Sequence, residues 1–474
     1  MRNGTFLSNG YFPVLAYDEN AELTDDDRRK DVGLAPRSRA LPLDDPKGRL
    51  RSDFVPDADW VTFEATVSTA PDQIALAPGY LQDSRMESGR RVFHYRMDAP
   101  IQNFYSFVSG AYAVRRDRWR DVNIEIYYYP GHEFDIDRMI AAVKKSLDYY
   151  TTQFGPYQYR QVRILEFPRY QVFAQSFPNT IPFSEGIGFI SRVENKDDDV
   201  DTPLFVTAHE VAHQWWGHQI VGAHVQGSQM LSESLAEYSA LMVMEHEQGR
   251  DASQKFLRYE LDRYLRGRSL EKKKELPLML VENQAYLHYR KGSLVFYALR
   301  DYIGEDRLNS ALAKFVADHR YPTAPYPTTR DFMQYIRAVT PDSLQYVITD
   351  LFETITLYDN SAIEATAERQ ADSTWRVQLK VAAHKFRADS LGNQREIPMG
   401  DYVDIGVFGE PAKGNKLGRP LALQKVYIDK PEVSAEFVVK ERPHKAGIDP
   451  YNKLIDRGPE DNVRAVSVKS GLLH

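Results

Sequence analysis

The chain has 474 residues, 42% of them hydrophobic and 27% charged, which is typical of a globular protein of about three domains. Its net charge of -7 argues against nucleic acid as a partner. It has no cysteine, which excludes disulfides, thiolate metal ligands and a cysteine nucleophile, and we find neither a signal peptide nor an apolar run of the roughly 18 residues that a membrane span needs.

Residues 1–120 are predicted to form a β domain. Apolar residues alternate at Val61, Phe63, Ala65 and Val67, which is the pattern of a half-buried strand. The polar stretch 18–59 is expected to be a loop, and its charged run 25–30 a solvated surface. Few strands are expected at the start, so this domain is predicted to be incomplete.

The next region alternates between strands and a helix. A strand is predicted over 122–129, a helix over 134–154, with apolar residues at helical spacing, and a second strand over 162–167. An extended segment punctuated by glycine and proline follows at 177–189, and it carries Glu185 in an apolar setting. The acidic run 197–199 lacks a calcium-loop pattern, and we expect a solvated loop there.

A helix with metal-binding spacing is predicted from Thr202 to Gly217. Thr202 would be its N-cap and Pro203 its first helical residue. It contains an H-E-x-x-H motif, in which His209 and His213 lie on one face, where both can reach one metal ion. Glu210 stands beside them and could take a proton from water on that metal.

A second helix over about 230–248 carries two candidate acidic partners, Glu233 and Glu237, on one face. If the two helices run antiparallel, Glu233 completes a His2Glu zinc site with an open position for water. Glu237 is a rival ligand, or else it orients a ligand histidine from behind. The remaining candidates lack ligand spacing and are expected to be bystanders: His218, His224, His246 and His288.

The rest of the chain divides into helices and strands. It is expected to be mostly helical to about residue 354, with a capping box at Thr328 and Asp331. Alternation with period two over 361–440 predicts a small antiparallel β-sandwich. The tail from Glu441 is expected to be basic and irregular.

Four motifs together resemble the aminopeptidase N and leukotriene hydrolase family of zinc metallopeptidases. The run 209–217 is similar to that family's H-E-x-x-H-Q-W-F-G, and 231–234 to its L-N-E-G. The run 184–188 is similar to the end of its exopeptidase motif, M-E-N-W-G, and 289–292 to its Y-x-K-G. The resemblance is strongest to bacterial versions fused behind a membrane permease, which implies a possible permease partner and an extracytoplasmic, periplasmic location.

The resemblance implies an α+β multidomain fold: an incomplete N-terminal β domain over 1–120, a thermolysin-like, mostly helical zinc peptidase domain over 121–355, and a β-sandwich with a tail over 356–474. It implies one Zn²⁺ per chain and a peptide substrate. Tyr289 would donate a hydrogen bond to the developing oxyanion. Glu185, with Gly186 and Gly188, would bind the free α-amine of the substrate.

The chain also departs from the family. Nineteen residues separate His213 from Glu233, where the family has 18, and of the exopeptidase motif only the glutamate and the later glycine remain. The alternatives to an aminopeptidase are therefore a zinc endopeptidase, or a non-catalytic interaction module on the same fold attached to a membrane transporter.

Overall fold

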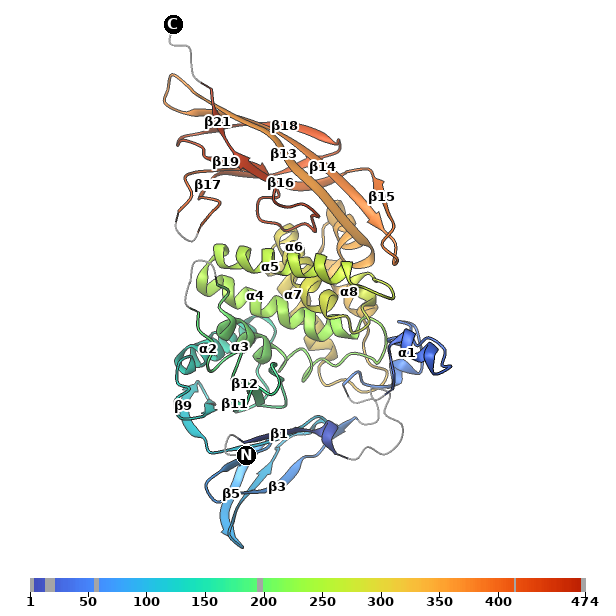
Figure 1. The fold of residues 1–474 in the computed structure, drawn as a ribbon, viewed down its shortest axis with the longest axis vertical. Coiled ribbons are helices and arrows are strands. Elements are labelled where there is room, and N and C mark those ends of the chain that lie inside the picture. Colours follow the sequence, from blue (N-terminus) through green and yellow to red (C-terminus); the bar gives the residue numbers. More distant parts are fainter. Residues whose placement is uncertain (1–3, 13–21, 55–58, 194–198, 413–414, 470–474) are drawn as a thin grey trace.

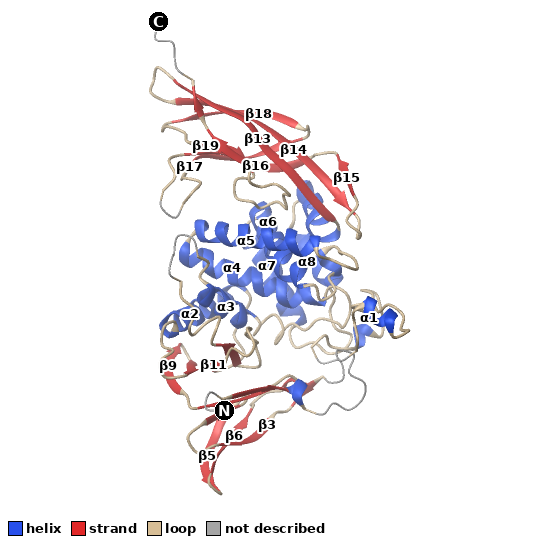
Figure 2. Ribbon diagram, viewed as in Figure 1, coloured by secondary structure: helices blue, strands red, loops and turns tan. Residues whose placement is uncertain are grey.

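The computed structural model describes residues 4–12, 22–54, 59–193, 199–412 and 415–469. Small β-sheets, a helical middle and a β-sandwich follow one another along the long axis of the molecule (Figures 1 and 2). The predicted α+β architecture with strands, then helices, then strands is therefore confirmed. Within the described residues, no helix is long and apolar enough to cross a membrane.

The N-terminal part is built from short antiparallel strands. One sheet has the order β1-β8-β4, a second β3-β6-β5, and β2 pairs with β7. These strands are β1 (Thr5–Ser8), β2 (Trp60–Val61), β3 (Glu64–Thr69), β4 (Ile74–Leu76), β5 (Tyr80–Glu87), β6 (Arg90–Arg96), β7 (Ile101–Gln102) and β8 (Ser106–Gly110).

The charged run in the predicted loop differs from the expectation. It forms a short helix, α1 (Asp26–Asp31), which Asp25 caps by accepting a hydrogen bond from Arg28 N. Arg29 is buried in it and donates to the backbone oxygens of Leu23 and Ala35, so part of this run is structural rather than solvated.

A four-stranded sheet separates the N-terminal strands from the helices. Its order is β12-β11-β10-β9, with β10, β11 and β12 parallel and β9 antiparallel to β10. Because neighbouring residues of a strand face opposite sides, Ile164 packs in the helical core and Leu165 in the N-terminal core. Its strands are β9 (Ala113–Trp119), β10 (Val122–Tyr128), β11 (Gln161–Phe167) and β12 (Thr180–Ser184).

Strand β9 lies in the region that the sequence assigned to the first domain, but its partner is β10 of the next one. The sheet of the middle domain thus begins before residue 121.

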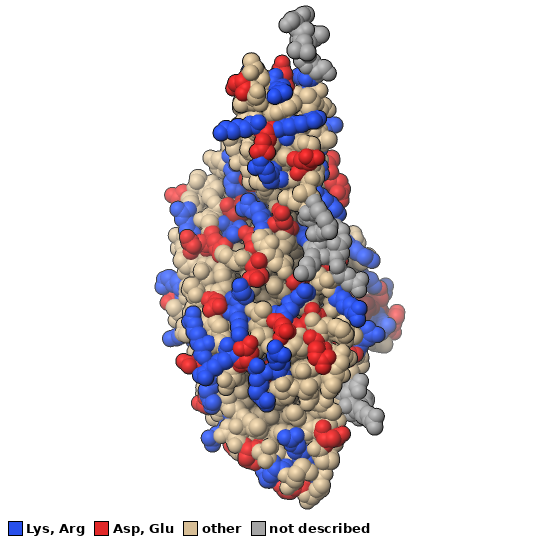
Figure 3. Space-filling model, turned by 90° about the vertical axis from the view of Figure 1, so that its left-hand side faces the viewer, with Lys and Arg blue, Asp and Glu red and all other residues tan. Residues whose placement is uncertain are grey.

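Acidic and basic side chains are interspersed on the face of the molecule drawn in Figure 3.

The helical middle supplies the largest core. Helix α2 buries Met139, Ile140, Val143, Leu147 and Tyr150, the stripe that the helical spacing predicted. The helices are α2 (Ile136–Gln153), α3 (Thr202–Ala212), α4 (Leu235–Gln248), α5 (Arg250–Ser269), α6 (Gly292–Ile303), α7 (Glu305–His319), α8 (Thr329–Val339) and α9 (Gln345–Ile348). The predicted capping box of Thr328 and Asp331 opens α8.

The C-terminal strands form two facing sheets around one apolar core, as predicted. One sheet has the order β15-β14-β13-β21, with β18 also paired to β14, and the other β17-β16-β19-β20. The strands are β13 (Ile355–Arg369), β14 (Trp375–Ala388), β15 (Gln394–Ile397), β16 (Asp401–Phe408), β17 (Pro420–Ile428), β18 (Glu432–Val439), β19 (Lys445–Ile448), β20 (Val463–Ala465) and β21 (Ser467–Val468). The last three lie in the tail that the sequence suggested was irregular, so that expectation was wrong.

Candidate metal centre

Helix α3 presents the H-E-x-x-H motif from a buried position. Its N-cap is Asp201, whose carboxylate accepts a hydrogen bond from Leu204 N at 3.2 Å, so Thr202 is the first helical residue and not the cap. Pro203 follows in the first turn, as predicted. The α-helix ends at Ala212, earlier than the predicted Gly217.

Glu233 reaches the two histidines from an irregular turn. Residues Met230–Ser234 form a π-helical turn directly before α4. A π turn holds one residue more than an α turn, and such turns are frequent at functional sites. A turn of this kind can absorb one extra residue, such as the one by which the spacing from His213 to Glu233 exceeds that of the resembled motif.

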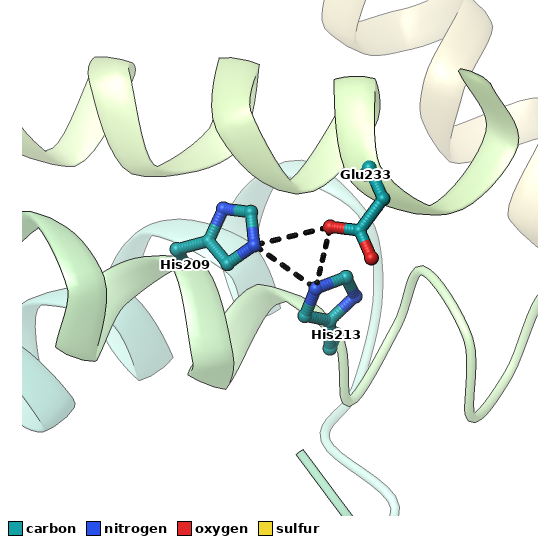
Figure 4. A group of neighbouring side chains, drawn as sticks. All are labelled: His209, His213 and Glu233. Carbon is teal, nitrogen blue, oxygen red and sulfur yellow. Dashed lines mark hydrogen bonds and ion pairs between the residues drawn. The ribbon is translucent and has the colours of Figure 1, made fainter. Parts of the chain in front are cut away.

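Three side chains converge on one point (Figure 4). The Nε2 atoms of His209 and His213 are 3.0 Å apart, and each lies 3.3 Å from Oε2 of Glu233. Nitrogen and oxygen ligands at about 2.1 Å from a tetrahedral zinc ion would be about 3.4 Å apart, close to this spacing.

The chemistry of the donors also fits a metal ion. Oε2 of Glu233 is buried and has no hydrogen-bond donor among the described residues, which would be costly for a carboxylate without a cation. His209, His213 and Glu233 are thus a candidate ligand set for one Zn²⁺.

Each histidine has a partner on its other ring nitrogen. Nδ1 of His213 donates to the backbone oxygen of Trp216 at 2.9 Å, and Nδ1 of His209 lies 3.2 Å from Oε1 of Glu237. Such partners orient ligand histidines and leave Nε2 free for the metal. Glu237 therefore lies behind His209, in the supporting position and not in the ligand position.

Glu210 and Tyr289 lie at the same pocket, which has a volume of about 130 Å³. Glu210 is 5% exposed, burial raises the pKa of its carboxyl, and its Oε2 has no partner within the described part of the chain. Tyr289 comes from a second π-helical turn, Tyr286–Lys291, and its ring centroid is 6.0 Å from that of His209. Burial, followed by the charge of Glu233, raises the pKa of Tyr289, which keeps its hydroxyl protonated as a donor.

Glu185, the residue expected to bind the substrate amine, is not among the residues that line this pocket. It follows β12 at the carboxyl end of the sheet, and its Oε1 accepts a hydrogen bond from Arg169 N at 3.2 Å. Its neighbours there are Glu166 and His132, which pair with each other. Neither Glu185 nor its two glycines line the metal pocket; Gly188 packs so closely on Phe183 that an added Cβ would lie 2.4 Å from that ring.

The segment that does line the pocket is Ala174–Ser176, which motif matching missed. It pairs antiparallel with β12 through Ala174 and Phe183. Two side chains that follow the motif hold it in place. The amide nitrogen of Gln214 donates to Ser176 Oγ at 2.5 Å, and Nε2 of His218 donates to the Ser176 backbone oxygen at 3.0 Å.

His218, expected to be a bystander, therefore belongs to the pocket wall, and Phe54 and Phe104 face it from the N-terminal part. The signal that could have identified Gln214 and His218 is their position, one and five residues after the second histidine, in the turns that follow helix α3.

The chain is similar to several known proteins. Residues 138–354 match the peptidase family M1 domain. The chain is 24% identical to tricorn protease-interacting factor F2 of Thermoplasma acidophilum, over 55% of this chain and 34% of that protein. It is 22% identical to aminopeptidase M1 of Arabidopsis thaliana, over 56% of this chain and 31% of that protein.

Among solved structures, aminopeptidase A of Legionella pneumophila, determined in complex with aspartic acid, superposes with a TM-score of 0.54. The match has 18% sequence identity and covers 89% of this chain and 45% of that one, so it shows a shared fold. The chain spans about a third of the length of the curated relatives that it matches. The region that matches the peptidase family M1 domain, residues 138–354, contains the whole candidate metal centre, from His209 to Tyr289.

Proposed function

We propose that the chain is a zinc-dependent peptidase that removes N-terminal residues from peptides. The observation that carries this proposal is the meeting of three ligand atoms, from His209, His213 and Glu233, in a pocket that also contains Glu210 and Tyr289. Two relatives of this chain are named aminopeptidases, which supports the exopeptidase form of the reaction.

The proposed chemistry is hydrolysis of a peptide bond. When bound, zinc would polarise the scissile carbonyl and lower the pKa of the attacking water. Glu210 takes a proton from that water and delivers it to the amine nitrogen as the C–N bond breaks. The hydroxyl of Tyr289 donates a hydrogen bond to the carbonyl oxygen as negative charge develops there.

An endopeptidase is the second candidate, because Glu185 does not line the pocket. The segment Ala174–Ser176 stands at the pocket wall in its place and carries no acidic side chain. A pocket of this kind would bind peptides through their backbone, whether or not the amine is blocked.

Hydrolysis of a panel of amino-acid p-nitroanilides, with N-acetylated versions beside them, tests the proposal. Zinc is quantified in every sample, and Glu210→Gln is the catalytic control. Turnover of free-amine substrates alone, lost in Glu210→Gln while zinc is retained, is the expected result. Equal turnover of blocked substrates would favour the endopeptidase, and a chain that binds no zinc would refute the proposal.

Association with a membrane permease, and a periplasmic location, stay hypotheses that rest on the sequence resemblance. None of the relatives described above is named as a permease. Co-purification of the protein with a permease from its native membrane would test both.

A further inference from the structure

Two π-helical turns meet beside the candidate metal centre. Met230–Ser234 carries Glu233, and Tyr286–Lys291 carries Tyr289. Neither turn has the α-helical geometry of the helix that follows it. The direction of each functional side chain therefore depends on the position of its turn. The contact between the two turns thus controls how Tyr289 stands relative to Glu233.

Ser234 makes that contact. Its Oγ donates a hydrogen bond to the backbone oxygen of His288 at 2.7 Å, and both residues are buried. Gly292, just after the second turn, lies against the same serine. A Cβ added to Gly292 would be 2.4 Å from Ser234 Oγ and 3.2 Å from its Cα, so the two backbones touch here.

The bond joins the residue directly after Glu233 to the peptide group directly before Tyr289. Because that peptide group cannot rotate without breaking the bond, the position of the Tyr289 main chain is fixed relative to the first turn. Where the resembled motif L-N-E-G has glycine, this chain has Ser234, so the link depends on a side chain that a glycine could not supply.

We propose that Ser234 is a positioning residue that fixes the position of the Tyr289 hydroxyl relative to the metal centre. The inference rests on the proposed peptidase function. Displacements of about 1 Å at a reacting centre can cost on the order of 10²-fold in rate, so a bond that fixes one backbone against another can matter for turnover. If this hydrogen bond only stabilised the core, its removal would lower activity by the same factor whether or not the Tyr289 hydroxyl was present.

A double-mutant cycle separates these two roles. We compare Ser234→Ala, Tyr289→Phe and the combined variant with the wild type, measuring kcat and KM on a p-nitroanilide, zinc content and melting temperature. Ser234→Ala should lower kcat about 10-fold with KM and zinc content unchanged, whereas in the Tyr289→Phe background the same change should cost less than about 2-fold.

Thr340→Val is the matched control, because its buried hydroxyl donates to the backbone oxygen of Ile336 at 2.8 Å, at the end of helix α8 and not in either π-helical turn. Its kcat should stay within about 2-fold of wild type. If Ser234→Ala destabilises the chain, Gly292→Ala tests the same contact from the other side, since its Cβ would push the two turns apart.

An equal loss from Ser234→Ala in both backgrounds, or a loss that follows the zinc content, would overturn the inference and leave the proposed function intact. A wild-type chain that binds zinc but cleaves no peptide would instead defeat the proposed function, and the inference with it.

Discussion

Oε1 of Glu237 lies 3.2 Å from Nδ1 of His209, while Nε2 of the same ring faces Glu233. One imidazole is thus held between two carboxylates with different tasks. Glu233 stands where a ligand must be, and Glu237 sets the orientation of the ring and strengthens it as a donor.

Replacing Glu237 by Gln should therefore weaken zinc binding without abolishing it. We expect the zinc affinity to fall about 10–100-fold, because partners of this kind typically contribute that much. Competition against a chromophoric chelator measures the affinity. Glu233→Gln is the comparison, and it should lose far more; equal losses in the two variants would mean that both carboxylates are ligands.

Gln214 should matter for substrate binding more than for zinc. Its amide holds Ser176 and the backbone of Phe177 and Asn179, so Gln214→Met leaves buried polar groups without partners at the pocket wall. We expect stability to fall by about 1–3 kcal/mol and KM to rise. Urea unfolding and steady-state kinetics check these effects.

Gln219→Met is the control for that experiment. Its amide is equally buried but bonds to Pro156 and Gln158, away from the segment Ala174–Ser176. It should lose similar stability and keep its KM. A raised KM in both variants would show that general loosening, and not the pocket wall, is responsible.

His288 should make the fold sensitive to acid. Burial lowers the pKa of its imidazole to about 4, from 6.5 in the unfolded chain. Since the folded state disfavours the proton, the stability from this group is present above pH 6.5 and is lost as the pH falls toward 4. Between pH 7.5 and 5 the loss is about 2 kcal/mol.

The variant His288→Phe keeps a ring beside Tyr289, which His288 contacts with ring centroids 4.4 Å apart, and removes the titrating group. Denaturant unfolding at pH 7.5 and pH 5 should show a smaller loss of stability in the variant than in the wild type. Identical pH dependence would place the acid sensitivity in other groups.

Lys385 should be important for joining the sandwich to the helices. Its ammonium lies 2.5 Å from Asp350, which precedes the sandwich, and 2.8 Å from Asp401 in β16, and all three are buried. Asp350 also pairs with Arg387 at 2.7 Å, so Lys385→Met leaves the buried Asp401 without a cation among the described residues, and we expect a loss of about 3–5 kcal/mol. Calorimetry measures the loss. The control is Lys380→Met, which should change little because Lys380 is half-exposed and pairs with the solvent-accessible Glu432.

Local patterns predicted what depends on local spacing. The four-residue spacing of the H-E-x-x-H motif predicted that His209 and His213 share one face of a helix beside Glu210. The helical spacing of apolar residues predicted the buried stripe of α2. Glu185 was matched within a window of five residues, but the wall of the pocket is set by antiparallel pairing of Ala174 with Phe183, nine residues apart. That pairing leaves no signature inside such a window.

The two π-helical turns could not be predicted for a related reason. Nothing in the local composition distinguishes an i→i+5 turn from an α turn, and the choice depends on packing between segments distant in sequence, such as Ser234 and His288. The tail strands β19 to β21 contain only two to four residues each, too few to show a period.

Strand β13 begins at Ile355, and its side chains contribute to two different hydrophobic cores. Ile355 and Leu357 pack among the helices, while Ala365 and Ala367 pack inside the sandwich. A protein cut after residue 355 would retain the helices but lose Leu357 from their core, together with the cation of Lys385. The helical middle therefore depends on the sandwich for part of its core, and heating should unfold the two together in one cooperative transition.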